Sequence, residues 1–299
     1  MTLAKRVQAA LSRPVDPAIS TFAERLAEDG DVRAVLFYGS NLRTGSLDGV
    51  LDFYVLTGGE AEAGLWPTVC YREWDHEGRA LRAKIATMTL AKFAEAARGD
   101  TRDTTVWARF VQPAASVWSD GSSDSGIARA IEDAALTAAR LAVALGPESG
   151  TEDAYWRALF RATYRAEFRV EKPGREDSIL ELNRAHFDGL LPDALDACGI
   201  SFSRNGETIA PAMPAAERAR MQKKWKRWRR WGKPLNIARL LRATRTFEGA
   251  GRYAAWKVQR HTGVEVEVTP WREKHPVLAA PGVLWRVWRE KRRARPPHM

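Results

Sequence analysis

The hydrophobic pattern of the first 120 residues predicts helices that alternate with short strands. Apolar positions recur with helical spacing in two early segments, and compact runs of β-branched and aromatic residues follow them. Between residues 79 and 88, Leu81, Ala83 and Ile85 alternate with Arg82 and Lys84, so this strand is expected to bury one face. The predicted elements are helices over 3–11, 17–29, 89–97 and 104–110, and strands over 32–38, 50–56, 79–88 and 115–118.

Beyond a polar linker at 119–125 the pattern becomes mainly helical. Helices are predicted over 126–145, 152–170 and 178–190, and no internal repeat is visible. The expected fold class is therefore α/β, with a small mixed sheet flanked by helices, then a mainly helical domain, then a basic amphipathic C-terminal helical segment. The corresponding domain boundaries are 1–121, 122–217 and 218–299.

Composition excludes several classes of protein. With 45% hydrophobic and 28% charged residues among 299, the chain is an ordinary globular sequence and not a disordered one. No apolar run approaches the length of a membrane-spanning helix, and the N-terminus lacks the apolar core of a secretory signal. Two cysteines cannot form a disulfide framework or a four-cysteine zinc site, and the five scattered histidines disfavour a histidine-based metal site.

Positive charge is concentrated at the C-terminal end. Residues 218–299 hold 23 Lys and Arg against 5 Asp and Glu, a net charge of +18, whereas residues 1–217 hold 24 against 32, a net charge of −8. Seven of the twelve tryptophans also lie in this segment, three of them at i, i+3 and i+6 in the stretch from Lys223 to Trp231. A second stretch, from Trp285 to Arg293, repeats the combination. Such a segment is expected to meet a polyanion.

Three interpretations of this Trp-rich basic segment remain open. Its tryptophans can pack on the protein core beneath a solvated basic face, which is the plainest explanation. Alternatively, they can lie at the headgroup level of an anionic membrane while Lys and Arg reach the lipid phosphates. Nucleic acid is the least favoured of the three partners.

Candidate chemistry is found where the first strand ends. Gly39 and Ser40 follow that strand, and Asp52 lies near the start of the next one. A glycine allows backbone amides to approach a triphosphate closely, and a serine hydroxyl can donate to a phosphate oxygen. A carboxylate on the neighbouring strand suits Mg²⁺, which prefers carboxylates together with phosphate oxygens. Nucleotidyl transfer fits this pattern, and so does an ordinary turn with a surface aspartate.

The order of several motifs resembles the mitochondrial phosphatidate cytidylyltransferase family, also called the translocator assembly and maintenance protein, within the DNA polymerase beta nucleotidyltransferase superfamily. The resemblance covers roughly residues 32–260. Its blocks are Phe37-Tyr38-Gly39-Ser40, Leu51-Asp52-Phe53-Tyr54-Val55, a basic residue at Arg82 or Lys84, Ala108-Arg109-Phe110-Val111-Gln112-Pro113, Tyr164-Arg165-Ala166-Glu167-Phe168-Arg169, Gly174-Arg175-Glu176-Asp177, and a late basic helix pair over 238–259.

This resemblance implies a peripheral membrane enzyme that makes CDP-diacylglycerol from CTP and phosphatidate with Mg²⁺. It implies a cytoplasmic location on the inner face of the membrane. The implied metal ligand is Asp52, with Glu167 as a further catalytic acid. Asp48, four residues before Asp52, is the candidate for a second catalytic and metal-binding acid, by its position and not by the family pattern. The implied nucleotide-binding residues are Tyr38, Gly39, Ser40, Arg82, Lys84, Arg109, Arg165 and Arg169.

The chain departs from that family pattern at three places. The superfamily normally shows two acids separated by one residue, but Val50 and Tyr54 flank Asp52 at those positions. Glu167 stands where the family has aspartate, and Val111-Gln112 replaces a more basic pair. The identity of the lipid therefore stays open. The choice of base and the oligomeric state are open as well, because no motif of the sequence determines them.

A stripe of arginines adds an independent candidate for anion binding. Arg157, Arg161, Arg165 and Arg169 recur every four residues, which keeps them on one face of the predicted helix. Four guanidinium groups in this arrangement suit a triphosphate or a phosphate headgroup. A solvated face paired with Glu152 and Glu167 is the alternative.

Two further hypotheses remain beside the lipid cytidylyltransferase. The chain can be a nucleotidyltransferase that acts on RNA, a small molecule or a protein, with the basic segment as a nucleic-acid arm. It can also be a catalytically degenerate nucleotide-binding scaffold, which the missing second acid favours.

Overall fold

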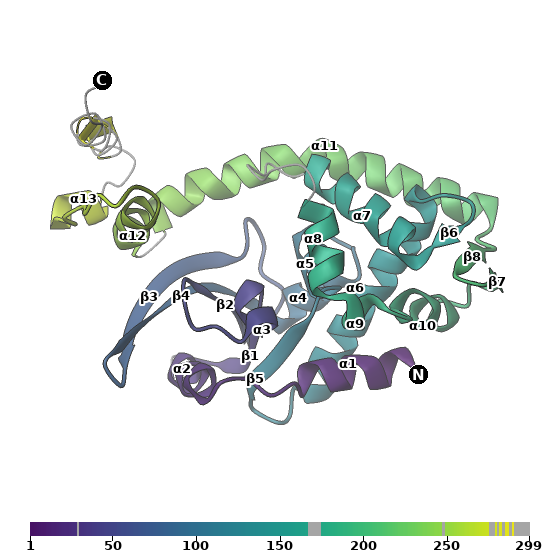
Figure 1. Cartoon of the computed structure of the whole chain (residues 1–299), viewed down its shortest axis with the longest axis horizontal. Helices are drawn as coiled ribbons and strands as arrows, with labels where there is room; N and C mark the ends of the chain where they lie inside the picture. The colour runs from purple at the N-terminus through teal and green to yellow at the C-terminus, as the bar shows by residue number, and fades with distance from the viewer. Residues whose placement is uncertain are drawn as a thin grey trace, which may run out of the picture.

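A five-stranded mixed sheet forms the centre of the N-terminal half (Figure 1). The computed structural model describes residues 1–28, 30–166, 175–246 and 249–274, together with 279, 281–282, 285–286 and 289. The strand order is β3-β4-β2-β1-β5; β2 and β4 run parallel and the other neighbours antiparallel. The strands are β1 (Val32–Tyr38), β2 (Leu51–Thr57), β3 (Thr68–His76), β4 (Arg79–Thr89) and β5 (Ala114–Ser119).

Helices flank this sheet and make up most of the second half. A small three-stranded sheet of order β6-β8-β7 lies among them. The helices are α1 (Leu3–Leu11), α2 (Pro17–Ala27), α3 (Ser40–Thr44), α4 (Leu90–Ala97), α5 (Thr105–Phe110), α6 (Asp124–Leu145), α7 (Glu152–Ala166), α8 (Arg175–Leu182), α9 (Arg184–Phe187), α10 (Leu190–Ala197), α11 (Ala215–Thr246), α12 (Ala250–Thr262) and α13 (Pro270–Lys274), and the small strands are β6 (Gly150–Thr151), β7 (Phe202–Asn205) and β8 (Thr208–Pro211).

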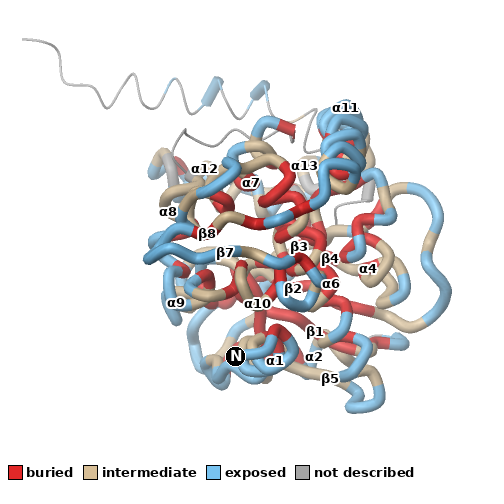
Figure 2. Tube along the Cα trace, turned by 90° about the vertical axis from the view of Figure 1, so that its right-hand side faces the viewer, coloured by how far each residue is buried: buried red, intermediate tan, exposed pale blue. Residues whose placement is uncertain are grey.

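The two faces of the large sheet belong to two separate hydrophobic clusters. On one face Phe53 stacks on Phe22 of α2 with ring centroids 5.3 Å apart. On the other face Tyr54 packs against Phe93 of α4 and Phe110 of α5. Because successive side chains of a strand alternate between faces, the consecutive aromatic residues Phe53 and Tyr54 anchor both layers. The central strands are consequently buried on both sides (Figure 2).

The second cluster continues across the predicted domain boundaries. It joins Leu36 and Tyr54 of the sheet to Leu141 of α6, Trp156 of α7 and Trp228 of α11. The three predicted segments therefore share one core. Within the described parts of the chain, no helix is both long and apolar enough to cross a bilayer.

The long helix α11 buries two of the three tryptophans clustered between Lys223 and Trp231. Trp225 and Trp228 are 6% and 0% exposed, and only Trp231 of the three is substantially open, at 40%. The Trp228 indole donates to the carbonyl oxygen of Thr101 at 2.7 Å and packs against Trp107 with centroids 5.5 Å apart. The interpretation that the tryptophans pack on the core therefore holds for two of these residues, while α11 exposes its basic outer side (Figure 2).

Most predicted elements of the first 145 residues are present. The pattern did not predict the edge strand β3, the short helix α3 or the hairpin of β7 and β8. The single helix predicted over 178–190 is wrong, because the chain is broken there into α8, α9 and the start of α10. Asn183 and Gly189 mark the two breaks, and Gly189 adopts a φ of +71° that a helix interior does not allow.

Truncation of the buried and the exposed tryptophan of α11 should have different consequences. Trp228→Ala is expected to lower the free energy of unfolding by about 3–5 kcal/mol, because it leaves a cavity and an unpaired carbonyl. Trp231→Ala, on the same helix, should cost about 1 kcal/mol or less. Denaturant unfolding of both variants measures the difference, and equal losses would contradict the packing described here.

Candidate active site

Four side chains form one row across the sheet. The register pairs Tyr38 of β1 with Asp52 of β2, Asp52 with Lys84 of β4, and Lys84 with Tyr71 of β3. Residues directly opposite each other on adjacent strands project to the same face. A carboxylate is thus flanked by a phenol on one side and an ammonium group on the other, directly beside the end of β1.

Gly39 follows this row and lies against the aspartate. Its φ of +91° and ψ of −158° fall in a region that is essentially restricted to glycine. A Cβ atom placed on Gly39 would lie 2.9 Å from Oδ2 of Asp52. Both the backbone conformation and the close approach therefore require glycine here. The structure brings the aspartate to the Gly39-Ser40 turn, as the sequence predicted.

A cavity of about 250 Å³ opens at this turn. Residues of the sheet, of α3, of α5 and the segment that follows it, and of α7 and α8 line this cavity. The lining residues are Tyr38, Gly39, Ser40, Arg43, Asp52, Lys84, Arg109, Gln112, Pro113, Tyr164 and Ile179. Six of the predicted site residues, Tyr38, Gly39, Ser40, Asp52, Lys84 and Arg109, are thus brought together.

Burial dominates the electrostatics of this cavity. It raises the pKa of Asp52 above its ordinary value, while the positive charges of Lys84 and Arg109 oppose the shift in part. Burial likewise raises the pKa of Tyr38, so its phenol is protonated at neutral pH. The lining residues include one carboxylate, that of Asp52, and the three cations Arg43, Lys84 and Arg109. The cavity thus has an excess of positive charge, which suits an anionic ligand.

Two aromatic residues hold Arg109 in the cavity. Its Nη1 donates to the Tyr54 hydroxyl at 3.2 Å, and its guanidinium carbon lies 5.3 Å from the ring centroid of Tyr38. Because Tyr54 is fully buried, its hydroxyl is a fixed acceptor for that hydrogen bond. This contact orients a residue of α5 toward the residues of β1 and β2.

The loop after Gly39 is held by a buried asparagine that the sequence analysis did not single out. The Asn41 amide donates to the carbonyl oxygens of Ser46 and Asp48 at 2.8 and 2.7 Å. This arrangement ties the short helix α3 to the loop that leads into β2. It also orients α3 so that Arg43 lines the cavity.

Three predicted site residues lie elsewhere. The Asp48 carboxylate is 84% exposed and pairs with Arg79 at 2.7 Å, so it is not part of the cavity lining. Arg82 pairs with Glu73 at 3.4 Å near the outer edge of the sheet. Arg165 is exposed on α7 and does not line the cavity. The remaining two, Glu167 and Arg169, lie outside the described residues.

The arginine stripe of α7 is largely occupied by acids of α8. Arg157 pairs with Asp177 at 2.5 Å, and Arg161 pairs with Glu176 at 2.8 Å. These two arginines therefore join α7 to α8. Tyr164 on α7 and Ile179 on α8, which the sequence analysis gave no role, line the cavity instead.

The described residues fit a divalent cation only together with a substrate. No group of three or more His, Cys, Asp and Glu side chains gathers as metal ligands within the described ranges. Asp52 and the Ser40 hydroxyl are oxygen donors in the cavity. Mg²⁺ is commonly held by one or two carboxylates, waters and substrate phosphates. A site with Asp52 as its protein carboxylate is compatible with that pattern.

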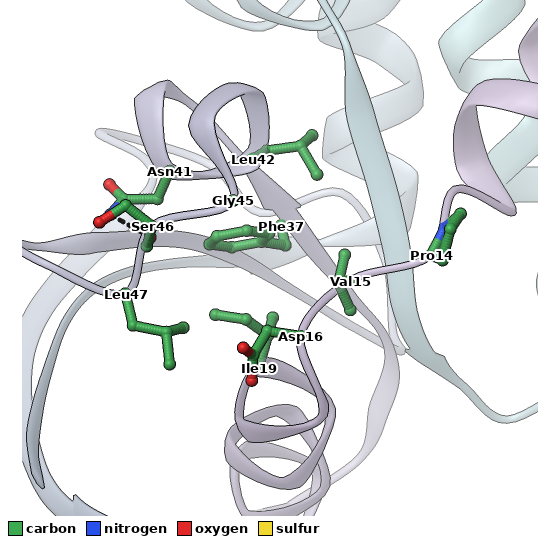
Figure 3. A pocket seen from close by; sticks show the side chains of 10 residues that line it. All are labelled: Pro14, Val15, Asp16, Ile19, Phe37, Asn41, Leu42, Gly45, Ser46 and Leu47. Atoms are coloured by element: carbon green, nitrogen blue, oxygen red, sulfur yellow. Dashed lines mark hydrogen bonds between the residues drawn. The ribbon is translucent and has the colours of Figure 1, made fainter.

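A second cavity of about 160 Å³ lies on the opposite face of β1 (Figure 3). Phe37, Ile19 and Leu47 contribute apolar walls. Its one acid, Asp16, accepts from the Ala18 amide at 2.9 Å and so caps α2. This cavity lacks the cations of the first one, and its polar groups are used in local structure.

Comparison with protein-family models gives no match, and comparison with curated proteins gives no significant match. The fold class is α/β, with a five-stranded mixed sheet flanked by helices.

The raised pKa of Asp52 predicts a pH-dependent effect of its neutralisation. A folded-state pKa above the unfolded one means that the ionised carboxylate destabilises the fold at neutral pH. Asp52→Asn should therefore raise the free energy of unfolding at pH 7. The gain should shrink as the pH falls through the raised pKa towards about 3.9, the ordinary value for aspartate.

Denaturant unfolding between pH 4 and pH 8 measures this difference. Asp48→Asn, at an exposed carboxylate, provides the matched control and should show little pH-dependent gain. A loss of stability in Asp52→Asn at pH 7, or a gain that does not vary with pH, would contradict the electrostatic account.

Proposed function

We propose that the chain is a nucleotidyltransferase that binds the triphosphate of a nucleotide at the Gly39-Ser40 turn. The observation that carries the proposal is the approach of the Asp52 carboxylate to Gly39 across adjacent strands, beside three cationic side chains. A glycine turn that admits close contact, a carboxylate for a divalent cation and an excess of positive charge together suit a triphosphate.

Six of the residues that line the cavity have a defined task in this reaction. Gly39 leaves room for phosphate oxygens near the backbone, and the Ser40 hydroxyl donates to one of them. Lys84, Arg109 and Arg43 neutralise the charge that develops as pyrophosphate leaves. Asp52 would hold Mg²⁺, which supplies further neutralisation at the phosphates when it is bound. A phosphate monoester acceptor is ionised near pH 7, so the reaction requires positioning and not a strong general base.

Support for a phosphorylated lipid as acceptor comes from the C-terminal segment. Trp231, Ile237, Trp271 and Trp285 are 40–58% exposed. On α11 the exposed cations Lys226, Arg227, Arg229 and Arg230 precede or adjoin the first of them. Exposed aromatic and aliphatic groups beside Lys and Arg suit an anionic bilayer surface. CTP as donor and phosphatidate as acceptor are the substrates we propose, in keeping with the motif order of the sequence.

Two alternatives make different predictions. A nucleotidyltransferase with an RNA, small-molecule or protein acceptor would turn over nucleotide without lipid. A nucleotide-binding scaffold would bind nucleotide without turnover. Asp52 is the one acid among the described residues that line the cavity, and the lack of a second acid there favours this alternative.

Pyrophosphate release measures the proposed reaction. Purified protein with CTP, Mg²⁺ and phosphatidate in vesicles should release pyrophosphate and form a CDP-lipid. Asp52→Asn should lower the rate by about 100-fold or more, because it removes a charged group at the phosphates. Asp48→Asn should change the rate by less than about threefold, because its carboxylate is exposed and pairs only at the surface.

The outcomes separate the candidates. Absence of turnover with every nucleotide and acceptor, in folded protein that binds CTP, would select the scaffold. Full activity of Asp52→Asn would remove Asp52 from the site and the proposal with it.

Vesicle co-sedimentation tests the proposed membrane surface. The double variant Trp231→Ala, Trp271→Ala should weaken binding to anionic vesicles by about tenfold, because two exposed indoles no longer enter the headgroup region. Leu182→Ala removes an exposed apolar side chain outside this segment and serves as the control. Retardation of RNA together with failure to sediment with vesicles would instead support the nucleic-acid arm.

A further inference from the structure

The basic helix α11 is anchored to the segment that leads into α5. Trp228 donates to the Thr101 carbonyl oxygen at 2.7 Å, and its ring fills the space beside Gly99, where an added Cβ would lie 2.9 Å away. Three helical turns further on, Arg239 reaches the same segment. The helix thus holds residues 99–105 at two points.

The second anchor is a buried ion pair. Arg239 Nη2 lies 2.6 Å from Oδ2 of Asp103, and the two side chains are 18% and 7% exposed. The Arg239 guanidinium carbon also lies 4.8 Å from the ring centroid of Trp66. Burial alone would raise the pKa of Asp103, but the charge and hydrogen bond of Arg239 hold it below its ordinary value. Asp103 is therefore ionised at neutral pH.

The other oxygen of the same carboxylate fixes the start of α5. Asp103 Oδ1 accepts from the backbone amide and the hydroxyl of Thr105 at 3.0 and 2.6 Å. Arg239 Nη1 adds a donor to the Thr105 hydroxyl at 3.3 Å. Since α5 spans only Thr105–Phe110, Arg109 lies about one turn from this anchor. A shift of the first turn therefore displaces the guanidinium that faces Asp52.

We propose that Arg239 is a positioning residue of the active site, which acts through Asp103 and the first turn of α5 to hold Arg109 in the cavity. The basic C-terminal helix is on this account part of the catalytic apparatus and not a separable tail. The expected effect on kinetics rests on the proposed function, whereas the expected effect on the order of α5 does not. Loss of either partner leaves the other charge buried and unpaired, which loosens the start of α5.

Steady-state kinetics and hydrogen exchange of the full chain test the proposal together. Arg239→Gln should lower kcat/KM for CTP by about 10- to 100-fold, the range expected for a displaced catalytic group. It should also accelerate exchange of the α5 amides. Arg239→Lys should recover part of the rate because it keeps the charge. Arg220→Gln removes a 74% exposed arginine from the same helix and should leave both readouts unchanged.

A double-mutant cycle identifies the route of the effect. In an Arg109→Gln background, Arg239→Gln should cost less than about threefold, because its action passes through the group already removed. The same loss in both backgrounds would show that Arg239 acts by another route, and wild-type kinetics in folded Arg239→Gln would overturn the proposal. Should Arg239→Gln fail to fold, Asp103→Asn and Arg239→Lys provide the same comparison.

The two proposals fail separately. A wild-type protein without turnover on any nucleotide counts against the proposed function alone. Exchange of the α5 amides then still decides the positioning role: acceleration in Arg239→Gln but not in Arg220→Gln supports it, and identical exchange in both overturns it.

Discussion

The close approach of the Asp52 carboxylate to Gly39 is the constraint on which the site depends. It requires that β1 and β2 pair in the observed register, that residue 39 lack a side chain, and that the carboxylate accept burial beside cations. Burial of a charge costs stability unless other charges compensate it. This arrangement keeps a carboxylate at the start of β2, against the glycine turn that follows β1. The proposed phosphate chemistry follows from that combination.

The helical half contributes to the site as well as to the core. Tyr164 and Ile179 line the cavity. Arg157 and Arg161 pair with acids of α8 and so join the two helices that carry these residues. On the other side, α11 holds the start of α5 through Asp103. The basic segment therefore combines two roles in our account: its exposed side is proposed to face an anionic surface, and its inner side supports Arg109. One helix thus carries both the proposed membrane-facing side and the residue proposed to support Arg109.

The sequence predicted the parts of the fold whose local pattern matches their burial. Strands β1 and β2 are continuous apolar runs because both faces are covered, and Leu81, Ala83 and Ile85 are buried in alternation as expected. Strand β3 was missed because it is an edge strand in which only Tyr71 is fully buried.

The turn and Asp52 were identifiable from spacing. Arg43, Tyr164 and Ile179 were not, because they reach the cavity through tertiary packing, and the paired state of Asp48 with Arg79 depends on a loop path that spacing does not determine.

The location of a divalent cation with a bound nucleotide tests the central claim most directly. Crystals grown with Mn²⁺ and a non-hydrolysable CTP analogue would place the metal by its anomalous scattering. The account predicts a metal within coordination distance of the Asp52 carboxylate, with the triphosphate lying over Gly39 and Ser40 and against Lys84 and Arg109. A metal and triphosphate bound elsewhere, with Asp52 uncoordinated, would contradict it.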